Sequence, residues 1–240
     1  EWVRIEAEEK ELLQKLNDIN TKAVKERQAK IATDLEKKIT DNGYFLEDET
    51  KFINSLNLNG IDEKAAKHLE NALDNFFERF PQLKGKLSGV VITEDIPQSA
   101  IAETSHLEGG LIKLNKKYWG NDRRIEEAIK NTVSEEFTVA KRPEDFIYHE
   151  LGHSFSFIAK TDWTTAEGYK ELYTKGGTIA EKIKRKMPAE IDSNILYPSK
   201  YATYNDDEWF AEQFSLMLQG RNKNTNFTDL IEKEAKRFEQ

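Results

Sequence analysis

Residues 143–160 read PEDFIYHELGHSFSFIAK, and this stretch predicts the helix around which the fold is built. Pro143 suits a first helical position, and Glu144 and Asp145 place negative charge in the first turn, where the helix dipole favours it. Apolar side chains recur with a period of 3.6 residues; they are Phe146, Ile147, Leu151, Phe155 and Ile158. We therefore expect this helix to be held firmly against a hydrophobic core.

The same helix carries the pattern HExxH in His149-Glu150-Leu151-Gly152-His153. Residues four apart lie one turn apart on the same helix face, so both imidazoles can reach a single Zn²⁺. Glu150 then lies beside them, where it can act on a water molecule at the metal. The alternative is a pair of structural histidines with an incidental glutamate between them.

A zinc site of this kind needs a third protein ligand and an open position for water. The chain has no cysteine, and its other histidines, His68 and His106, both lie upstream in contexts typical of an amphipathic helix and a turn. The longer motif HExxHxxGxxH is excluded, because Ser156 and Ala159 stand where it requires Gly and His. The third ligand is therefore expected to be a downstream carboxylate.

Glu171 and Glu208 are the two candidates for that carboxylate. The sequence around Glu171 lacks a strong helical stripe. Glu208 opens a predicted helix that Asp206 or Asp207 can cap. Its buried side would consist of Trp209, Phe210, Phe214, Met217 and Leu218. Glu208 and Glu212 share one face, which fits a ligand and a hydrogen-bond acceptor for a ligand histidine, although a solvated acidic face has the same spacing.

Residues 201–214, YATYNDDEWFAEQF, complete a resemblance to a known family. A Tyr-Ala pair, followed seven residues after the tyrosine by Glu-aromatic-aromatic-Ala-Glu-x-Phe, resembles the second signature of the anthrax-lethal-factor-like zinc metallopeptidases. This family includes Pro-Pro endopeptidases of Gram-positive bacteria. The resemblance covers residues 143–160 and 197–218. It implies a zincin-like α+β fold, mostly helical with a small mixed sheet.

The resemblance also implies roles for individual residues. His149, His153 and Glu208 would bind one Zn²⁺ per chain, and Glu150 would be the general base. Tyr201 would stabilise the oxyanion, a role for which Tyr204 and Tyr197 are nearby rivals, and Glu212 would support a ligand. A secreted protein that hydrolyses protein or peptide substrates is the activity and location that this family implies.

Upstream of the motif the pattern predicts a helix over Ile61–Phe80 and strands over Leu87–Thr93, Ala100–Ser105 and Leu111–Asn115. In zincins an edge strand commonly holds an extended substrate by backbone pairing. We expect Gly110–Leu114 to be that edge. The segment 161–200, rich in Gly, Thr, Lys and Pro, is expected to shape access for the substrate.

The first 42 residues predict an N-terminal helical arm, and residues 43–240 a catalytic domain. The arm has an apolar stripe that ends near Asp41-Asn42-Gly43; its members are Trp2, Ile5, Leu12, Leu16, Ile19, Ala23, Val24, Ile31, Leu35 and Ile39. Packing on the body is the favoured expectation. Pairing with another chain or joining an upstream domain are the alternatives.

Composition sets the remaining limits. A net charge of −8 argues against nucleic acid as the main partner, and no apolar run is long enough for a transmembrane helix. The absence of cysteine excludes disulfides.

The favoured function is a zinc endopeptidase. The alternative is a catalytically silent zincin scaffold that binds partners within a larger toxin or phage structural protein, against which the intact Glu150 argues. The oligomeric state, substrate and cleavage preference are not indicated.

Overall fold

The computed structural model describes residues 2–46, 56–105, 108–158 and 178–239, and these form a mostly helical α+β fold with one small mixed sheet. The predicted α+β class is confirmed. The helices are α1 (Trp2–Asp41), α2 (Glu63–Arg79), α3 (Lys116–Trp119), α4 (Asp122–Glu135), α5 (Pro143–Ser156), α7 (Ile179–Lys184), α8 (Ser193–Leu196), α9 (Asp206–Leu218) and α10 (Thr225–Ala235), with 3-10 turns at Pro81–Leu83, Tyr201–Thr203 and Lys236–Phe238.

The sheet has four strands in the order β1-β2-β4-β3: β1 (Leu56–Asn57), β2 (Val90–Thr93), β3 (Ala102–Ser105) and β4 (Leu111–Asn115). β1, β2 and β4 are parallel, and β3 runs antiparallel to β4. The prediction that Gly110–Leu114 forms an edge was wrong, because β4 pairs with both β2 and β3. Four of the five β4 residues are buried, as suits a central strand, whereas β3, the outer strand beside β4, is only partly buried.

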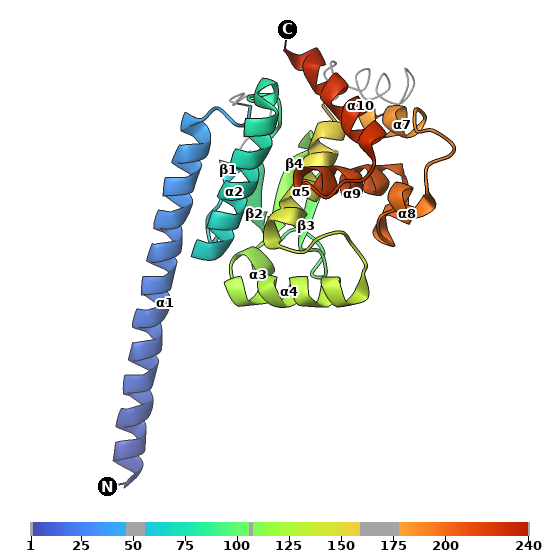
Figure 1. Ribbon diagram of the computed structural model, residues 1–240. Helices are drawn as coiled ribbons and strands as arrows, with labels where there is room; N and C mark the ends of the chain where they lie inside the picture. Colours follow the sequence, from blue (N-terminus) through green and yellow to red (C-terminus); the bar gives the residue numbers. More distant parts are fainter. Residues whose placement is uncertain (1, 47–55, 106–107, 159–177, 240) are drawn as a thin grey trace.

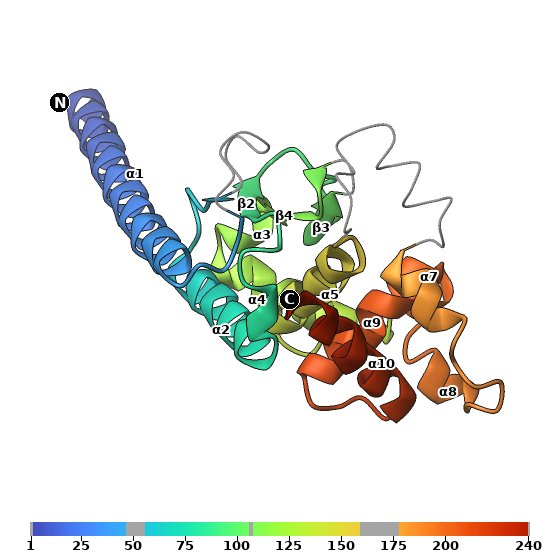
Figure 2. The same cartoon turned by 90° about the horizontal axis from the view of Figure 1, so that it is seen from above.

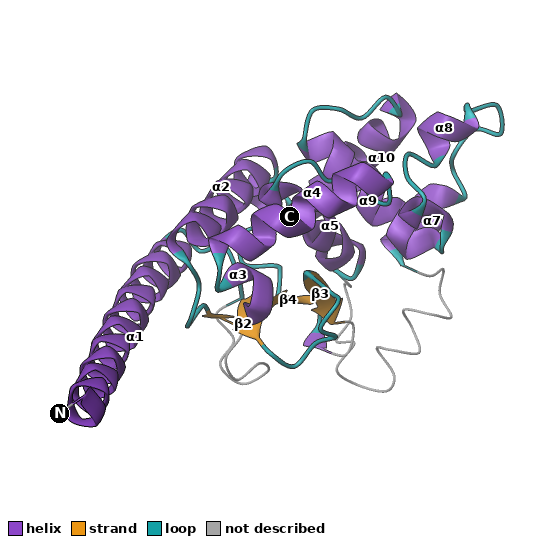
Figure 3. Cartoon of the chain, turned by 90° about the horizontal axis from the view of Figure 1, so that it is seen from below, coloured by secondary structure: helices purple, strands orange, loops and turns teal. Residues whose placement is uncertain are grey.

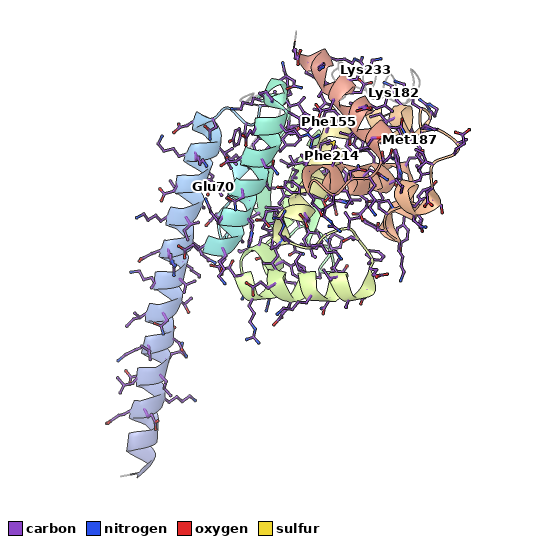
Figure 4. All side chains as sticks on the ribbon, viewed as in Figure 1. Glu70, Phe155, Lys182, Met187, Phe214 and Lys233 are labelled. Atoms are coloured by element: carbon purple, nitrogen blue, oxygen red, sulfur yellow. The ribbon has the colours of Figure 1, made fainter. Side chains whose placement is uncertain are left out.

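The helices lie on one side of this sheet (Figure 3). α5 contacts β3 and β4, and both α2 and α9 pack on α5, which places α5 at the centre of the body (Figure 2). Phe155 of α5 and Phe214 of α9 stack with ring centroids 5.5 Å apart, within a cluster of buried phenylalanines (Figure 4). The motif helix packs against the core as the sequence predicted, but it is buried on nearly every side and not along one stripe, and it ends at Ser156.

The long helix α1 extends away from the body, and only its C-terminal part packs on it (Figure 1). Ala32, Leu35 and Ile39 are buried in the same core as α2. The expected packing on the body is therefore correct for this part. It is wrong farther back, where the stripe residues Leu12, Leu16, Ile19 and Val24 are exposed. Among the described residues, no helix combines the length and apolarity needed to cross a membrane.

A partly exposed cluster of charged and polar side chains connects α1 to α2. Lys38 Nζ lies 2.6 Å from Glu70 Oε1 and 2.8 Å from Asp74 Oδ2. Tyr44 donates a 2.6 Å hydrogen bond to the other oxygen of Asp74. Burial opposes ionisation of Asp74, but its hydrogen bonds to Lys38 and Tyr44 outweigh burial and lower its pKa. The end of α1 is thus tied to the body by charge as well as by packing.

Candidate metal and catalytic site

The site forms where α5 crosses α9, and both helices begin at well-defined caps. The carboxylate of Asp145 accepts hydrogen bonds from the N–H groups of Lys141 and Arg142 at 2.7 and 3.0 Å. α9 is capped by Asn205, whose side chain accepts from the N–H of Glu208 at 2.8 Å. The prediction that Asp206 or Asp207 caps this helix was wrong, because both residues already lie inside it. Their charges still favour the helix N-terminus.

Gly152, inside the HExxH motif, sets the distance between the two helices. A Cβ at this position would lie 3.0 Å from the Cβ of Phe214 and 3.1 Å from the Cα of Ala211. Such approaches are closer than side-chain atoms tolerate without movement. The absent side chain therefore lets α9 lie directly against α5, and this contact brings Glu208 beside the two histidines.

Three ligand atoms converge at the crossing. His149 Nε2 and His153 Nε2 are 3.1 Å apart, and Glu208 Oε2 lies 3.1 Å from the first and 3.3 Å from the second. Ligands at 2.0–2.1 Å from a tetrahedral zinc ion are separated by about 3.3 Å. Both histidines are buried, and the three residues form a group that could hold a metal ion.

Of the other potential ligands that the sequence offered, His68 alone lies among the described residues. His68 lies in α2, with Nδ1 2.9 Å from Glu144 Oε1, and it takes no part in the cluster. Glu171 and His106 lie outside the described residues. Of the two carboxylates that the sequence left open, Glu208 is therefore the one that the described structure brings to the histidines.

Glu212 contacts His149 at Nδ1, the ring nitrogen that does not face the candidate metal group. Nδ1 of His149 lies 2.9 Å from Glu212 Oε1. The other oxygen, Oε2, accepts hydrogen bonds from the N–H of Val139 at 2.8 Å and from the hydroxyl of Ser199 at 2.6 Å. A donor proton on Nδ1 leaves the lone pair of Nε2 free for a metal. The sequence-based expectation that Glu212 contacts a ligand histidine agrees with this geometry.

Electrostatics at the cluster favour a positive charge. Burial alone would lower the pKa of His149, but hydrogen bonds to Glu208 and Glu212 outweigh burial and raise it to about 10. Burial alone would raise the pKa of Glu208, and the hydrogen bonds from His149 and His153 instead hold it well below its usual range. Without a metal, the acids keep a proton on the imidazole; a divalent cation could replace that charge.

The side chain of Glu150 faces the sheet, where it accepts a hydrogen bond from Thr104 of the outer strand β3. The hydroxyl Oγ1 of Thr104 lies 2.7 Å from Glu150 Oε2 and 3.1 Å from the backbone carbonyl of the same residue. Both side chains are buried. The carboxylate is thereby held in one orientation next to the histidines.

Of the three tyrosines that the sequence offered, Tyr201 is the one that contacts the histidines. Its ring stacks on His149 with centroids 5.6 Å apart and on Phe137 with centroids 5.1 Å apart. Burial and the negative charge of Glu208 raise the pKa of its hydroxyl above the usual range, so the hydroxyl stays protonated at neutral pH. Tyr204 packs against the ring of Tyr201 but is 64% exposed, and Tyr197 faces the ammonium of Lys184.

A cavity of about 240 Å³ opens beside these groups. His149, Glu150 and Tyr201 form one wall. The remaining lining is largely apolar and includes Ala100, Ile101, Ala102, Phe137, Ala140 and Phe146. A side chain of a bound peptide could occupy this space next to the carboxylate of Glu150.

The sequence did not reveal the residues that hold the carboxylates in place. Thr104, Val139 and Ser199 contact Glu150 or Glu212 across long sequence separations. The only available signal was that Ser199 stands two residues before Tyr201.

Comparisons of the chain with models of known protein families, with curated proteins and with solved structures found no match.

Proposed function

We propose that this protein is a zinc-dependent endopeptidase of the lethal-factor-like zincin type. The observation that carries the proposal is the triangle of His149 Nε2, His153 Nε2 and Glu208 Oε2, whose edges of 3.1 to 3.3 Å suit a tetrahedral zinc ion. Two imidazoles and one carboxylate are a donor set typical of catalytic zinc, and three protein ligands leave the fourth position open.

The groups around the triangle support hydrolysis of an amide bond. A bound Zn²⁺ would act as a Lewis acid that makes water nucleophilic near neutral pH. Glu150 would accept the proton of that water and pass it to the leaving amine nitrogen. Thr104 would keep the carboxylate aimed at the reacting atoms. The protonated hydroxyl of Tyr201 would donate a hydrogen bond to the developing oxyanion.

The outer strand supports a polypeptide substrate. β3 carries Thr104 and borders the cavity beside Glu150 through Ala102. Its outer edge can pair with an extended peptide backbone, which takes over the role first expected for Gly110–Leu114. A side chain of that peptide would then enter the 240 Å³ cavity.

The test measures metal content and peptidase activity together. We expect about one zinc per wild-type chain and its loss from His153→Ala and Glu208→Ala. Glu150→Gln should keep the zinc and lose activity by at least about a hundredfold on a diverse peptide pool. Zinc-loaded wild type that cleaves no peptide in the pool would favour the silent scaffold, and wild type without zinc affinity would overturn the metal site.

A further inference from the structure

A second cavity, of about 520 Å³, lies beside the proposed catalytic site and is strongly basic. Segments 136–141, 194–200 and 221–223 line it. Four cationic side chains belong to the lining, Lys141, Lys200, Arg221 and Lys223, against the single acidic residue Glu136. This concentration of positive charge is unexpected in a chain whose net charge is −8. Such a surface attracts anions.

The cations of this basic pocket retain donors for a ligand. All four side chains are exposed, and within the described ranges none of them forms an ion pair with an acidic side chain; Lys200 Nζ lies 3.4 Å from the carbonyl of Glu135. Arg221 donates from Nη1 to the carbonyl of Val139 at 3.0 Å and to the side-chain oxygen of Gln219. A guanidinium has five N–H donors, so several remain to bind an anion.

The basic pocket adjoins the 240 Å³ cavity beside Glu150. Thr138 lines both cavities. Val139 accepts from Arg221 in the basic pocket and donates to Glu212, which holds His149. Ser199, also in the lining, donates to the same carboxylate. A polypeptide bound at Glu150 would therefore pass close to the basic pocket.

We propose that the basic pocket binds acidic side chains of the polypeptide that the site cleaves, so that the substrate class is an acidic segment. This inference rests on the proposed function. A single phosphate group is best bound by donors that converge on one point. Here the cations come from separate segments around a large cavity, an arrangement that suits several carboxylates along one chain.

The test compares a pocket variant with a control of equal charge change. Lys141→Gln/Lys223→Gln removes two pocket charges and leaves Arg221, whose bond to Val139 supports the metal site. Lys25→Gln/Lys30→Gln removes two charges from exposed positions on α1, remote from the pocket (Figure 1). The readout is the sequence of peptides cleaved from a pool, followed by kcat/KM for matched peptides with Glu or Gln at the enriched positions.

We expect wild type and the α1 control to enrich Asp and Glu at fixed positions and to prefer the Glu peptide about tenfold. The pocket variant should lose most of this preference, and added salt should reduce it in wild type. Cleavage without acidic enrichment, or an unchanged preference in the pocket variant, would overturn the proposal.

If the protein is not a peptidase, neither wild type nor either variant will cleave any peptide in the pool, which distinguishes this outcome from failure of the basic-pocket proposal. In that case the acidic-peptide site is tested by the affinity for labelled hexaglutamate, with unlabelled hexaglutamate, hexaglutamine and inorganic phosphate as competitors. Equal affinity of wild type and the pocket variant would overturn an acidic-peptide site. Displacement by inorganic phosphate at lower concentrations than by unlabelled hexaglutamate would show a phosphate site instead. Weaker binding by the pocket variant alone would support the pocket.

Discussion

Thr104 Oγ1 of the outer strand lies 2.7 Å from Glu150 Oε2 of the central helix, so the sheet holds the proposed general base. Replacing Thr104 by Val removes the hydroxyl but keeps the shape. We expect unchanged zinc content and a fall in kcat of about tenfold, because a misoriented carboxylate loses part of its general-base contribution. Thr104→Ser should restore most of kcat. A valine variant with wild-type kcat would show that the contact does not serve the reaction.

The close contact at Gly152 gives a prediction about stability. In Gly152→Ala, the new methyl group would meet Phe214 and Ala211 at about 3 Å, so α9 must move away from α5. Overpacking of this kind costs about 1–3 kcal/mol of unfolding free energy. Because α9 carries Glu208 and Glu212, zinc affinity should fall as well. Thermal unfolding with and without zinc measures both effects; unchanged values for both would contradict the role assigned to Gly152.

The sequence could predict which side chains of α5 and α9 form the candidate metal group, because the spacing within each helix is local. A spacing of four residues on a helix fixes His149 and His153 on one face, and it places Glu208 and Glu212 on one face in the same way. Both helices are buried on nearly every side, and they pack against each other in one core. The spacing within each helix predicts which side chains share a face, whereas the contact of Glu212 with His149 also depends on how the two helices pack.

The sheet order and the supporting contacts could not be predicted in this way. Whether β3 or β4 is the outer strand depends on pairing between distant segments, and both strands are short. The contacts of Thr104 and Val139 follow from that topology. The partial packing of α1 depends on the length of α2, because the apolar stripe of α1 continues past the end of its partner.

Tyr201 and Tyr204 offer a matched pair of substitutions. Tyr201→Phe removes a hydroxyl beside the metal-binding group but keeps the ring stacked on His149. We expect it to retain zinc and stability and to lose about tenfold to a hundredfold in kcat, because one hydrogen bond to the oxyanion is lost. Tyr204→Phe is the control, since Tyr204 is 64% exposed and touches the edge of the Tyr201 ring. Equal activity of the two variants would remove Tyr201 from the mechanism.

The proton on His149 predicts how zinc binding depends on pH. Because the pKa of this imidazole is raised from 6.5 to about 10 without metal, its positive charge stabilises the metal-free fold fully below pH 6.5. That stabilisation is lost as the pH rises through about 10. Zinc requires the unprotonated nitrogen, so its binding must displace this proton.

We therefore expect about one proton to be released per zinc bound near neutral pH, and an affinity that rises about tenfold per pH unit between pH 6.5 and about 10. Calorimetric titrations in two buffers of different ionisation enthalpy count the protons. Glu212→Gln supplies the comparison: it removes a negative charge that raises the pKa of His149, so fewer protons should be released at the same pH. A binding enthalpy that is the same in both buffers for the wild type would mean that the imidazole is already neutral before zinc arrives.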